Sequence, residues 1–190
     1  MLFRSMFDIE TLDAESTAVV LSASIIHFEI GEQYTYEQLL ERACFVKFNA
    51  QEQVDLGRSV DKGTVDWWAN QHEYVRKISL ARLKDDLTAV QGINIIKEYM
   101  AQYPEKNQTM WSRGSLDQMA IDSLCKATKQ ELIAPYYVWR DVRTAVDLLT
   151  ETGKGGYCDI DHPTFQRHNV IKHHPTHDCA LDIMMLIYGK

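Results

Sequence analysis

The sequence predicts an α/β protein whose sheet begins with antiparallel strands and continues with parallel ones. Two observations predict this class: three strand-like segments come first in the chain, and strand and helix alternate in its later part. The chain has 190 residues, and no linker or internal repeat divides it. We therefore expect a single domain over residues 1–190.

Five segments have the composition of strands, which makes the expected sheet five-stranded and mixed, with helices on its flanks. Residues 2–9 are apolar up to an acidic pair at their end, residues 18–30 are rich in Val, Ile and Ser, and residues 44–48 alternate. Residues 109–113 and a short segment from 135 to 139 are the later strands.

Helical periodicity is strongest in the middle and at the end of the chain. Apolar side chains from Leu83 to Met100 step by three or four residues, which predicts one long amphipathic helix. Thr64 offers an N-cap for a short helix over residues 64–70. A final helix begins near Pro175, because proline is favoured at the first helical position. The other segments that allow helices are residues 34–42, 51–56, 119–127 and 141–149.

Charge and composition narrow the classes of function. Twenty lysines and arginines stand against 27 aspartates and glutamates, so the formal net charge is −7. A protein that binds nucleic acid by general electrostatic attraction is normally basic, so any contact with phosphates must be local or bridged by metal cations. No apolar run reaches the roughly 18 residues of a membrane helix, and we expect no membrane partner.

The cysteines indicate a reducing compartment. Cys44, Cys125, Cys158 and Cys179 show no Cys-x-x-Cys spacing and do not cluster. A disulfide framework is therefore not expected, and cytoplasmic thiols fit this pattern better.

Two carboxylates stand at the end of the first predicted strand. Asp8 and Glu10 are two residues apart, so the period of a strand places both on one face, roughly 7 Å apart. Such a pair is unfavourable on a buried strand unless a cation neutralises it, and hard cations such as Mg²⁺ prefer carboxylate oxygens. The alternative is an acidic pair that faces solvent at the edge of the sheet.

Three further polar residues are candidates for the same site. Asp117 opens a predicted helix, where capping is its alternative role. Asp178 lies in the first turn of the final helix and His173 five residues earlier, a separation that does not place two side chains on one helix face. With Pro175 at the first helical position, His173 lies on the preceding loop, and the two side chains can converge. The alternative for His173 is an exposed loop residue.

These residues, in this order, resemble the DEDDh set of 3′-5′ exonucleases. The matching segments are Phe7-Asp8-Ile9-Glu10-Thr11, Leu116-Asp117, and His173 with Asp178. Within that superfamily the chain is most similar to the exonuclease A enzymes of T-even phages and their RNase T-like relatives. That similarity rests on Trp67-Trp68-Ala69-Asn70-Gln71, Arg113-Gly114-Ser115-Leu116-Asp117, Arg140-Asp141-Val142-Arg143-Thr144 and His177-Asp178-Cys179-Ala180-Leu181-Asp182.

Two positions depart from the pattern of the superfamily. Leu116 stands where an aromatic residue often precedes the aspartate, and Ser112 lies in a stretch that often has an asparagine. Neither departure removes an expected metal ligand.

The resemblance implies a ribonuclease H-like fold and a mechanism with two divalent ions, Mg²⁺ or Mn²⁺, about 4 Å apart. It implies that Asp8 bridges both ions and that Asp117 supports the second of them. Glu10 and Asp178 would hold the ion that binds the attacking water. His173 would be the general base, a role that suits an imidazole with a free pKa of about 6.5.

Four residues are candidates for contact with the nucleic acid. Trp67 and Trp68 could stack on bases, although core packing is the alternative, and neighbours on a helix point about 100° apart, so one of the two is expected to be exposed. Arg140 and Arg143 could contact phosphate, with an ion pair to a nearby aspartate as the alternative.

A zinc protein is a rival interpretation. The end of the chain, including a glycine-rich loop over residues 152–168, is dense in soft ligands, and part of their spacing resembles a finger-like set. These ligands are Cys158, His162, His168, His173, His174, His177 and Cys179. The acidic set is explained without zinc, which disfavours this interpretation.

We thus expect an enzyme that shortens single-stranded DNA from its 3′ end and releases nucleoside 5′-monophosphates. RNA or short oligonucleotides are the alternative substrates, and an inactive nucleic-acid-binding module on the same fold is the alternative function. The resemblance also implies a phage-encoded protein that acts in the host cytoplasm, and a homodimer.

Overall fold

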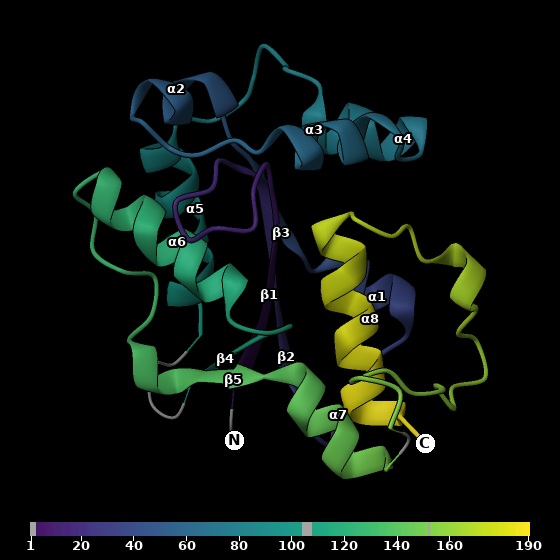
Figure 1. The fold of residues 1–190 in the computed structure, drawn as a ribbon. Helices are drawn as coiled ribbons and strands as arrows, with labels where there is room; N and C mark the ends of the chain where they lie inside the picture. Colours follow the sequence, from purple (N-terminus) through teal and green to yellow (C-terminus); the bar gives the residue numbers. More distant parts are fainter. Residues whose placement is uncertain (1–2, 104–107, 152) are drawn as a thin grey trace.

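A mixed sheet of five strands runs through the protein (Figure 1). The computed structural model describes residues 3–103, 108–151 and 153–190. The strands, in the spatial order β3-β2-β1-β4-β5, are β1 (Phe3–Thr11), β2 (Val20–Glu29), β3 (Cys44–Lys47), β4 (Thr109–Ser112) and β5 (Trp139–Asp141). The pairs β1–β2 and β2–β3 are antiparallel, whereas β1–β4 and β4–β5 are parallel. The predicted fold class is confirmed.

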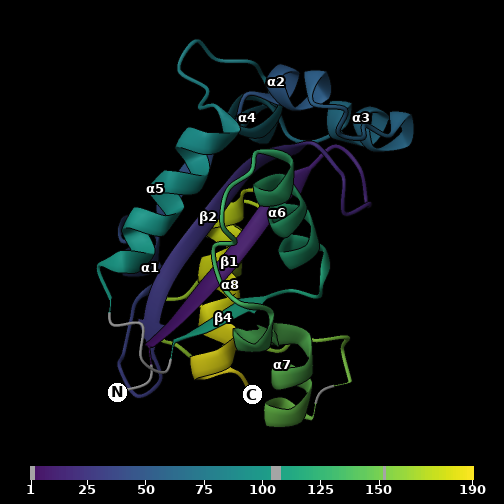
Figure 2. The same ribbon diagram turned by 90° about the vertical axis from the view of Figure 1, so that its left-hand side faces the viewer.

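Helices cover both faces of this sheet (Figures 1 and 2). One face carries α1 (Tyr36–Glu41) and α8 (Pro175–Tyr188), and the other carries α5 (Ala89–Ala101) and α6 (Leu116–Ala127). The remaining elements are α2 (Ala50–Asp55), α3 (Lys62–Ala69) and α4 (Glu73–Val75) with a π-helical turn (Arg76–Leu80), α7 (Val142–Thr150), and 3₁₀ turns at Tyr136–Val138 and Arg167–Asn169. In Figure 1, α2, α3 and α4 lie beyond the end of the sheet where β1 finishes.

The alternation of β1 decides which side chains meet which helices. Phe7 and Ile9 are buried in a cluster with side chains of α5 and α6. Met6 is buried on the opposite face, in a cluster with side chains of α8. Because strand side chains alternate, Asp8 and Glu10 share the face of Met6 and point toward the side of α8.

The long helix predicted from Leu83 is shorter than expected, because it begins at Ala89. Thr88 and Gln91 form a capping box, in which each side chain accepts a hydrogen bond from the other residue's backbone N–H. Leu83 is 52% exposed, and its N–H is held by the Asp86 carboxylate in a turn. The apolar spacing therefore extends by chance to residues that precede the true start of the helix.

Two other predicted boundaries are wrong. The helix that carries the two tryptophans begins at Lys62, because Asp61 and not Thr64 is its N-cap; the Asp61 carboxylate accepts a hydrogen bond from the Thr64 N–H. The segment that follows Pro135 forms a 3₁₀ turn, and strand β5 starts only at Trp139.

Several smaller predictions also have an outcome. The segment 34–42 contains helix α1, and all four cysteines are free thiols. Leu2 of the first predicted strand and Thr152 of the glycine-rich loop lie outside the described residues. Over the ranges that the structure describes, no helix is long and apolar enough to cross a membrane.

Candidate active site

Acidic side chains from three elements meet at the end of the sheet near α8. Strand β1 supplies Asp8 and Glu10, and the first turns of α6 and α8 supply Asp117 and Asp178. Three of these carboxylates, together with His173, line a cleft of about 620 Å³, and Asp117 is buried beside them. The structure thus brings together all five residues that the sequence singled out.

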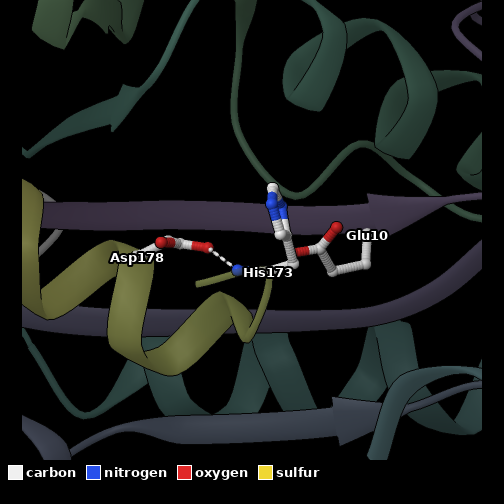
Figure 3. A group of neighbouring side chains, drawn as sticks. All are labelled: Glu10, His173 and Asp178. Atoms are coloured by element: carbon white, nitrogen blue, oxygen red, sulfur yellow. Dashed lines mark hydrogen bonds between the residues drawn. The ribbon is translucent and has the colours of Figure 1, made fainter. Parts of the chain in front are cut away.

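The tightest part of this arrangement is a group of three side chains. One ligand atom each from Glu10, His173 and Asp178 lies within 4.8 Å of the other two (Figure 3). The three residues come from β1, from the turn before α8 and from α8 itself. This spacing suits simultaneous contact with one cation.

The turn before α8 explains how His173 reaches the carboxylates. His174 is the N-cap, its ring accepts a hydrogen bond from the Thr176 N–H, and Pro175 is the first helical residue. His173 has a φ of +61°, in the left-handed region. Its N–H donates to Asp178 Oδ2 over 3.0 Å, which holds this conformation. As expected, His173 lies outside the helix and beside Asp178.

The ring of His173 packs edge-on against Trp67, with 4.7 Å between the ring centroids. Burial lowers the pKa of His173, and the charge of Lys172 lowers it further. The imidazole is therefore neutral at pH 7 and has a ring nitrogen that can accept a proton.

The carboxylates have the opposite shift. Burial, and then the charges of Asp117 and Asp178, raise the pKa of Asp8 well above its ordinary value. Burial followed by the charges of Asp178 and Asp117 does the same for Glu10. Burial also raises the pKa of Asp117 and of Asp178 to about 7. Without a cation these groups retain protons near neutral pH, and a divalent cation would displace them.

This donor set fits a hard divalent cation. Among the described residues, no lysine or arginine forms an ion pair with the four carboxylates expected to be ligands. Arg113 lines the cleft but pairs with Asp182 instead, with its Nε 3.1 and 3.2 Å from the two carboxylate oxygens. Clustered carboxylates without a direct ion pair are the environment in which bound metal supplies the missing charge.

Sequence reasoning did not assign a role to Arg113 or Asp182. A signal for Asp182 was present, because it lies four residues after Asp178 and therefore on the same face of α8. Arg113 follows β4 directly, but nothing in the sequence indicated that its side chain turns into the cleft.

The two tryptophans have different environments. Trp67 is 42% exposed, beside His173. Trp68 is 1% exposed and its Nε1 donates to the carbonyl of Thr11 over 2.9 Å. The assignment of Trp68 as a nucleic-acid contact is therefore corrected: its ring packs in the core and fixes α3 to the end of β1.

Neither Arg140 nor Arg143 lines the cleft of the carboxylates. Arg140 donates to the carbonyls of Tyr137 and Trp139, and Arg143 donates to the carbonyl of Arg113. Neither forms an ion pair with a described aspartate. Their contact with phosphate stays a prediction.

The zinc interpretation finds no support in the geometry. Among the described residues, the one group of His, Cys, Asp or Glu side chains close enough to share a cation is the group of Glu10, His173 and Asp178. Cys158 and Cys179 are buried and are not part of it.

Solved structures with the same fold are nucleases. The nuclease domain of 3′hExo, a DEDDh family member bound to rAMP, has a TM-score of 0.52 at 11% identity and covers 77% of this chain and 69% of its own. The zinc-bound complex of E. coli ExoI with ssDNA has a TM-score of 0.52 at 11% identity, with 98% of this chain and 39% of that chain covered.

The amino-acid sequence is similar to that of a phage nuclease and matches one family of exonucleases. The exodeoxyribonuclease of Enterobacteria phage T4 is 28% identical over 207 residues, which cover 99% of this chain and 89% of the phage protein. With the fold, this places the protein among the 3′-5′ exonucleases of the DEDDh type, which act on nucleic acid. The family model of the Rv2179c-like 3′-5′ exoribonuclease domain matches residues 4–186, and the chain belongs to that family. An inactive module is thereby disfavoured.

Proposed function

We propose that this protein, as one domain over residues 1–190, removes nucleotides from the 3′ end of single-stranded DNA. The observation that carries the proposal is the convergence of the acidic set with His173 in one cleft. In each turnover, water would form a new bond to phosphorus, and the bond between phosphorus and the 3′ oxygen of the shortened strand would break to leave a 3′-hydroxyl. The phosphate would leave with the terminal nucleoside as a 5′-monophosphate.

The carboxylates of Asp8, Glu10, Asp117 and Asp178 would hold two divalent ions, Mg²⁺ or Mn²⁺. When bound, such ions neutralise the phosphate and lower the pKa of a water molecule. The support is the donor set: oxygen ligands, raised carboxylate pKa values and no competing ion pair among the described residues.

His173 would take the proton of the attacking water on a ring nitrogen. Its lowered pKa keeps the ring neutral at working pH, which a general base requires. The Asp178 carboxylate holds the backbone of His173, and Trp67 contacts its ring, so both neighbours orient the base.

The exposed ring of Trp67 would stack on the base of the terminal nucleotide. Stacking of this kind tolerates any base sequence but requires a base that is free of its partner strand. A single-stranded 3′ end meets that requirement.

The choice of DNA rests on the phage T4 exodeoxyribonuclease, which is similar over nearly the whole of both chains. The description of the family as exoribonuclease-like favours RNA as the second candidate. The likeness to the T4 protein also supports action in the cytoplasm of a bacterial host.

Oligonucleotides that share one base sequence but differ in their sugars would decide between DNA and RNA as the substrate. We would compare kcat/KM for all-DNA, all-RNA and DNA with a single 3′-terminal ribonucleotide. The proposal expects the all-DNA strand to be hydrolysed fastest and the single 2′-hydroxyl to slow its removal. Faster hydrolysis of the all-RNA strand would replace DNA by RNA and leave the site assignment intact.

A homodimer is also expected from the resemblance. Leu148 and Leu149 of α7 are largely exposed and would be covered by a second copy. Analytical ultracentrifugation of the protein and of Leu148→Glu measures this directly, and a monomeric wild-type protein would exclude it.

A further inference from the structure

A tyrosine side chain lines the cleft of the carboxylates. Tyr157 lies on the segment between α7 and α8 and is 45% exposed. The guanidinium of Arg113 lies over its ring, 4.1 Å from the centroid. This contact is a cation–π interaction, which holds the ring in a fixed plane.

Arg113 is itself held rigidly. Its Nε donates to both oxygens of the buried Asp182, and its second nitrogen donates to the carbonyl of Gly156 over 3.0 Å. A buried, bidentate pair of this kind has little freedom to move. The support beneath Tyr157 therefore connects β4, α8 and the loop that carries the ring.

The loop is fixed just before the tyrosine. The Gly156 N–H donates to the carboxylate of Asp147 on α7 over 2.8 Å. Gly156 has a φ of +78°, and a Cβ there would lie 2.6 Å from Cα of Arg143. Only glycine fits this close approach, so the ring of Tyr157 starts from a defined backbone position.

The two exposed aromatic rings lie at opposite ends of the acidic set. Trp67 belongs to α3, which the bond from Trp68 to Thr11 fixes next to the Glu10 end of β1. Strand β4 runs parallel to β1 with Trp111 beside Met6, so Arg113 follows on the side of Asp8. The carboxylates thus lie between Trp67 and the ring of Tyr157.

We propose that Tyr157 stacks on the penultimate base of the substrate, while Trp67 takes the terminal base. This inference rests on the proposed function, because the scissile phosphate joins these two nucleotides and would lie at the carboxylates between them. Arg167 and Lys172 line the same cleft and supply the positive charge for the phosphates that follow. The preferred substrate is then at least a dinucleotide, with any base at either position.

A cycle of four dissociation constants tests the assignment. Wild-type protein and Tyr157→Ala would each be titrated with a fluorescent single strand, intact or with an abasic tetrahydrofuran residue at the penultimate position. Ca²⁺ would replace Mg²⁺ to favour binding over turnover. Each change alone should weaken binding about tenfold, because a stacked base is lost in either case. The combination of Tyr157→Ala with the abasic strand should also weaken binding about tenfold, because both changes remove the same stacking contact.

Controls separate stacking from damage to the fold. Tyr157→Phe should bind like the wild type. Tyr136→Ala removes an exposed tyrosine ring outside the cleft and should change nothing. An abasic residue at the fourth position should have no effect on the wild-type protein. This last comparison needs no variant, so it holds even if Tyr157→Ala fails to fold.

Two results would overturn the assignment. One is a dissociation constant about a hundredfold higher when both changes are combined. The other is a wild-type dissociation constant that does not change when the penultimate base is removed. Turnover of the intact strand with Mg²⁺ would be recorded in parallel. Absence of turnover would refute the proposed function whatever the binding cycle shows, so the two failures are distinguishable.

Discussion

His173 combines three features that a general base needs. Its ring is neutral because burial lowers its pKa, its backbone is fixed by Asp178, and it lies within 4.8 Å of the ligand atoms of two carboxylates. The left-handed φ of a histidine indicates that the surrounding structure determines this position rather than local preference.

Replacement of the ring tests that role. His173→Ala should lower kcat by roughly 10²–10⁴-fold, the range for loss of a general base. The concentration of Mn²⁺ that gives half-maximal rate should change far less. His72→Ala is a matched control, because His72 is an exposed histidine on the approach to α4. Parallel loss of turnover and metal affinity would make His173 a metal ligand instead.

Asp117 gives a prediction for pH. Its pKa is raised in the folded state to about 7, so the folded protein binds more protons than the unfolded chain between about pH 4 and pH 7. The carboxylate therefore lowers the free energy of unfolding above pH 7 and does not change it below pH 4.

In metal-free protein, Asp117→Asn should raise Tm by several degrees at pH 8 and scarcely at pH 4.5. The buried histidines change stability in the opposite direction with pH, but they are common to both proteins and cancel in the difference. Differential scanning calorimetry of the wild-type protein and Asp117→Asn measures this difference in Tm. Equal gains at both pH values would contradict repulsion as the cause, and added Mn²⁺ should remove the advantage at pH 8.

At the scale of elements, the turn before α8 and the loop before Tyr157 position the cleft. Both depend on backbone conformations with positive φ, and at Gly156 a Cβ would also meet the backbone of Arg143. The carbonyl of Gly156 also accepts a hydrogen bond from Arg113, so a shift of this loop reaches the carboxylates.

Gly156→Ala should destabilise the protein by about 2–4 kcal/mol and lower kcat/KM, because the new Cβ meets the backbone of Arg143. Gly153→Ala is the matched control. Gly153 has a φ of +59°, and a Cβ there would have no atom within 4 Å. We therefore expect a loss of stability of about 1–2 kcal/mol and no change in kcat/KM. Urea unfolding and initial rates would compare the two variants. Equal effects of Gly156→Ala and Gly153→Ala would show that the strain of a positive φ is responsible, and not the contact with Arg143.

The sequence predicted the type of most elements but not all of their ends. An apolar run located β2, because that strand is buried on both faces, and alternation located the partly exposed β3. The apolar residues before Asp8 located β1. The start of α5 was misplaced, since exposed Leu83 happens to continue a helical spacing. The π-helical turn after α4 was missed because hydrogen bonding within the turn, not side-chain pattern, defines it.

In the whole molecule, the grouping of the acidic set with His173 was predictable because it resembles a known order of residues. Local patterns paired Asp8 with Glu10 and His173 with Asp178. No local pattern would have joined these two pairs with each other or with Asp117. Arg113 and Tyr157 were not assigned a role, because their contacts depend on the path of a long loop, which hydrophobic periodicity does not describe.

We expect the fold to form without bound metal. Three buried hydrophobic clusters hold the sheet and helices together. Removal of divalent cations by EDTA should therefore abolish turnover while the far-ultraviolet circular dichroism is unchanged. Restored activity on addition of Mn²⁺ is the control. Loss of the helical signal would make the metal a structural element instead.

We expect the acidic cleft to remove nucleotides from a 3′ end when divalent metal is bound. The most direct measurement follows one single strand, labelled at its 5′ or 3′ end, with wild-type protein and Asp8→Asn, with Mg²⁺ or with EDTA. We predict that the 3′ label appears at once as a mononucleotide and that the 5′-labelled strand shortens stepwise, only for wild type with Mg²⁺. Asp8→Asn should be slower by about a thousandfold or more. Release from the 5′ end would exclude a 3′-5′ exonuclease, and activity that survives EDTA or Asp8→Asn would exclude a metal site at Asp8.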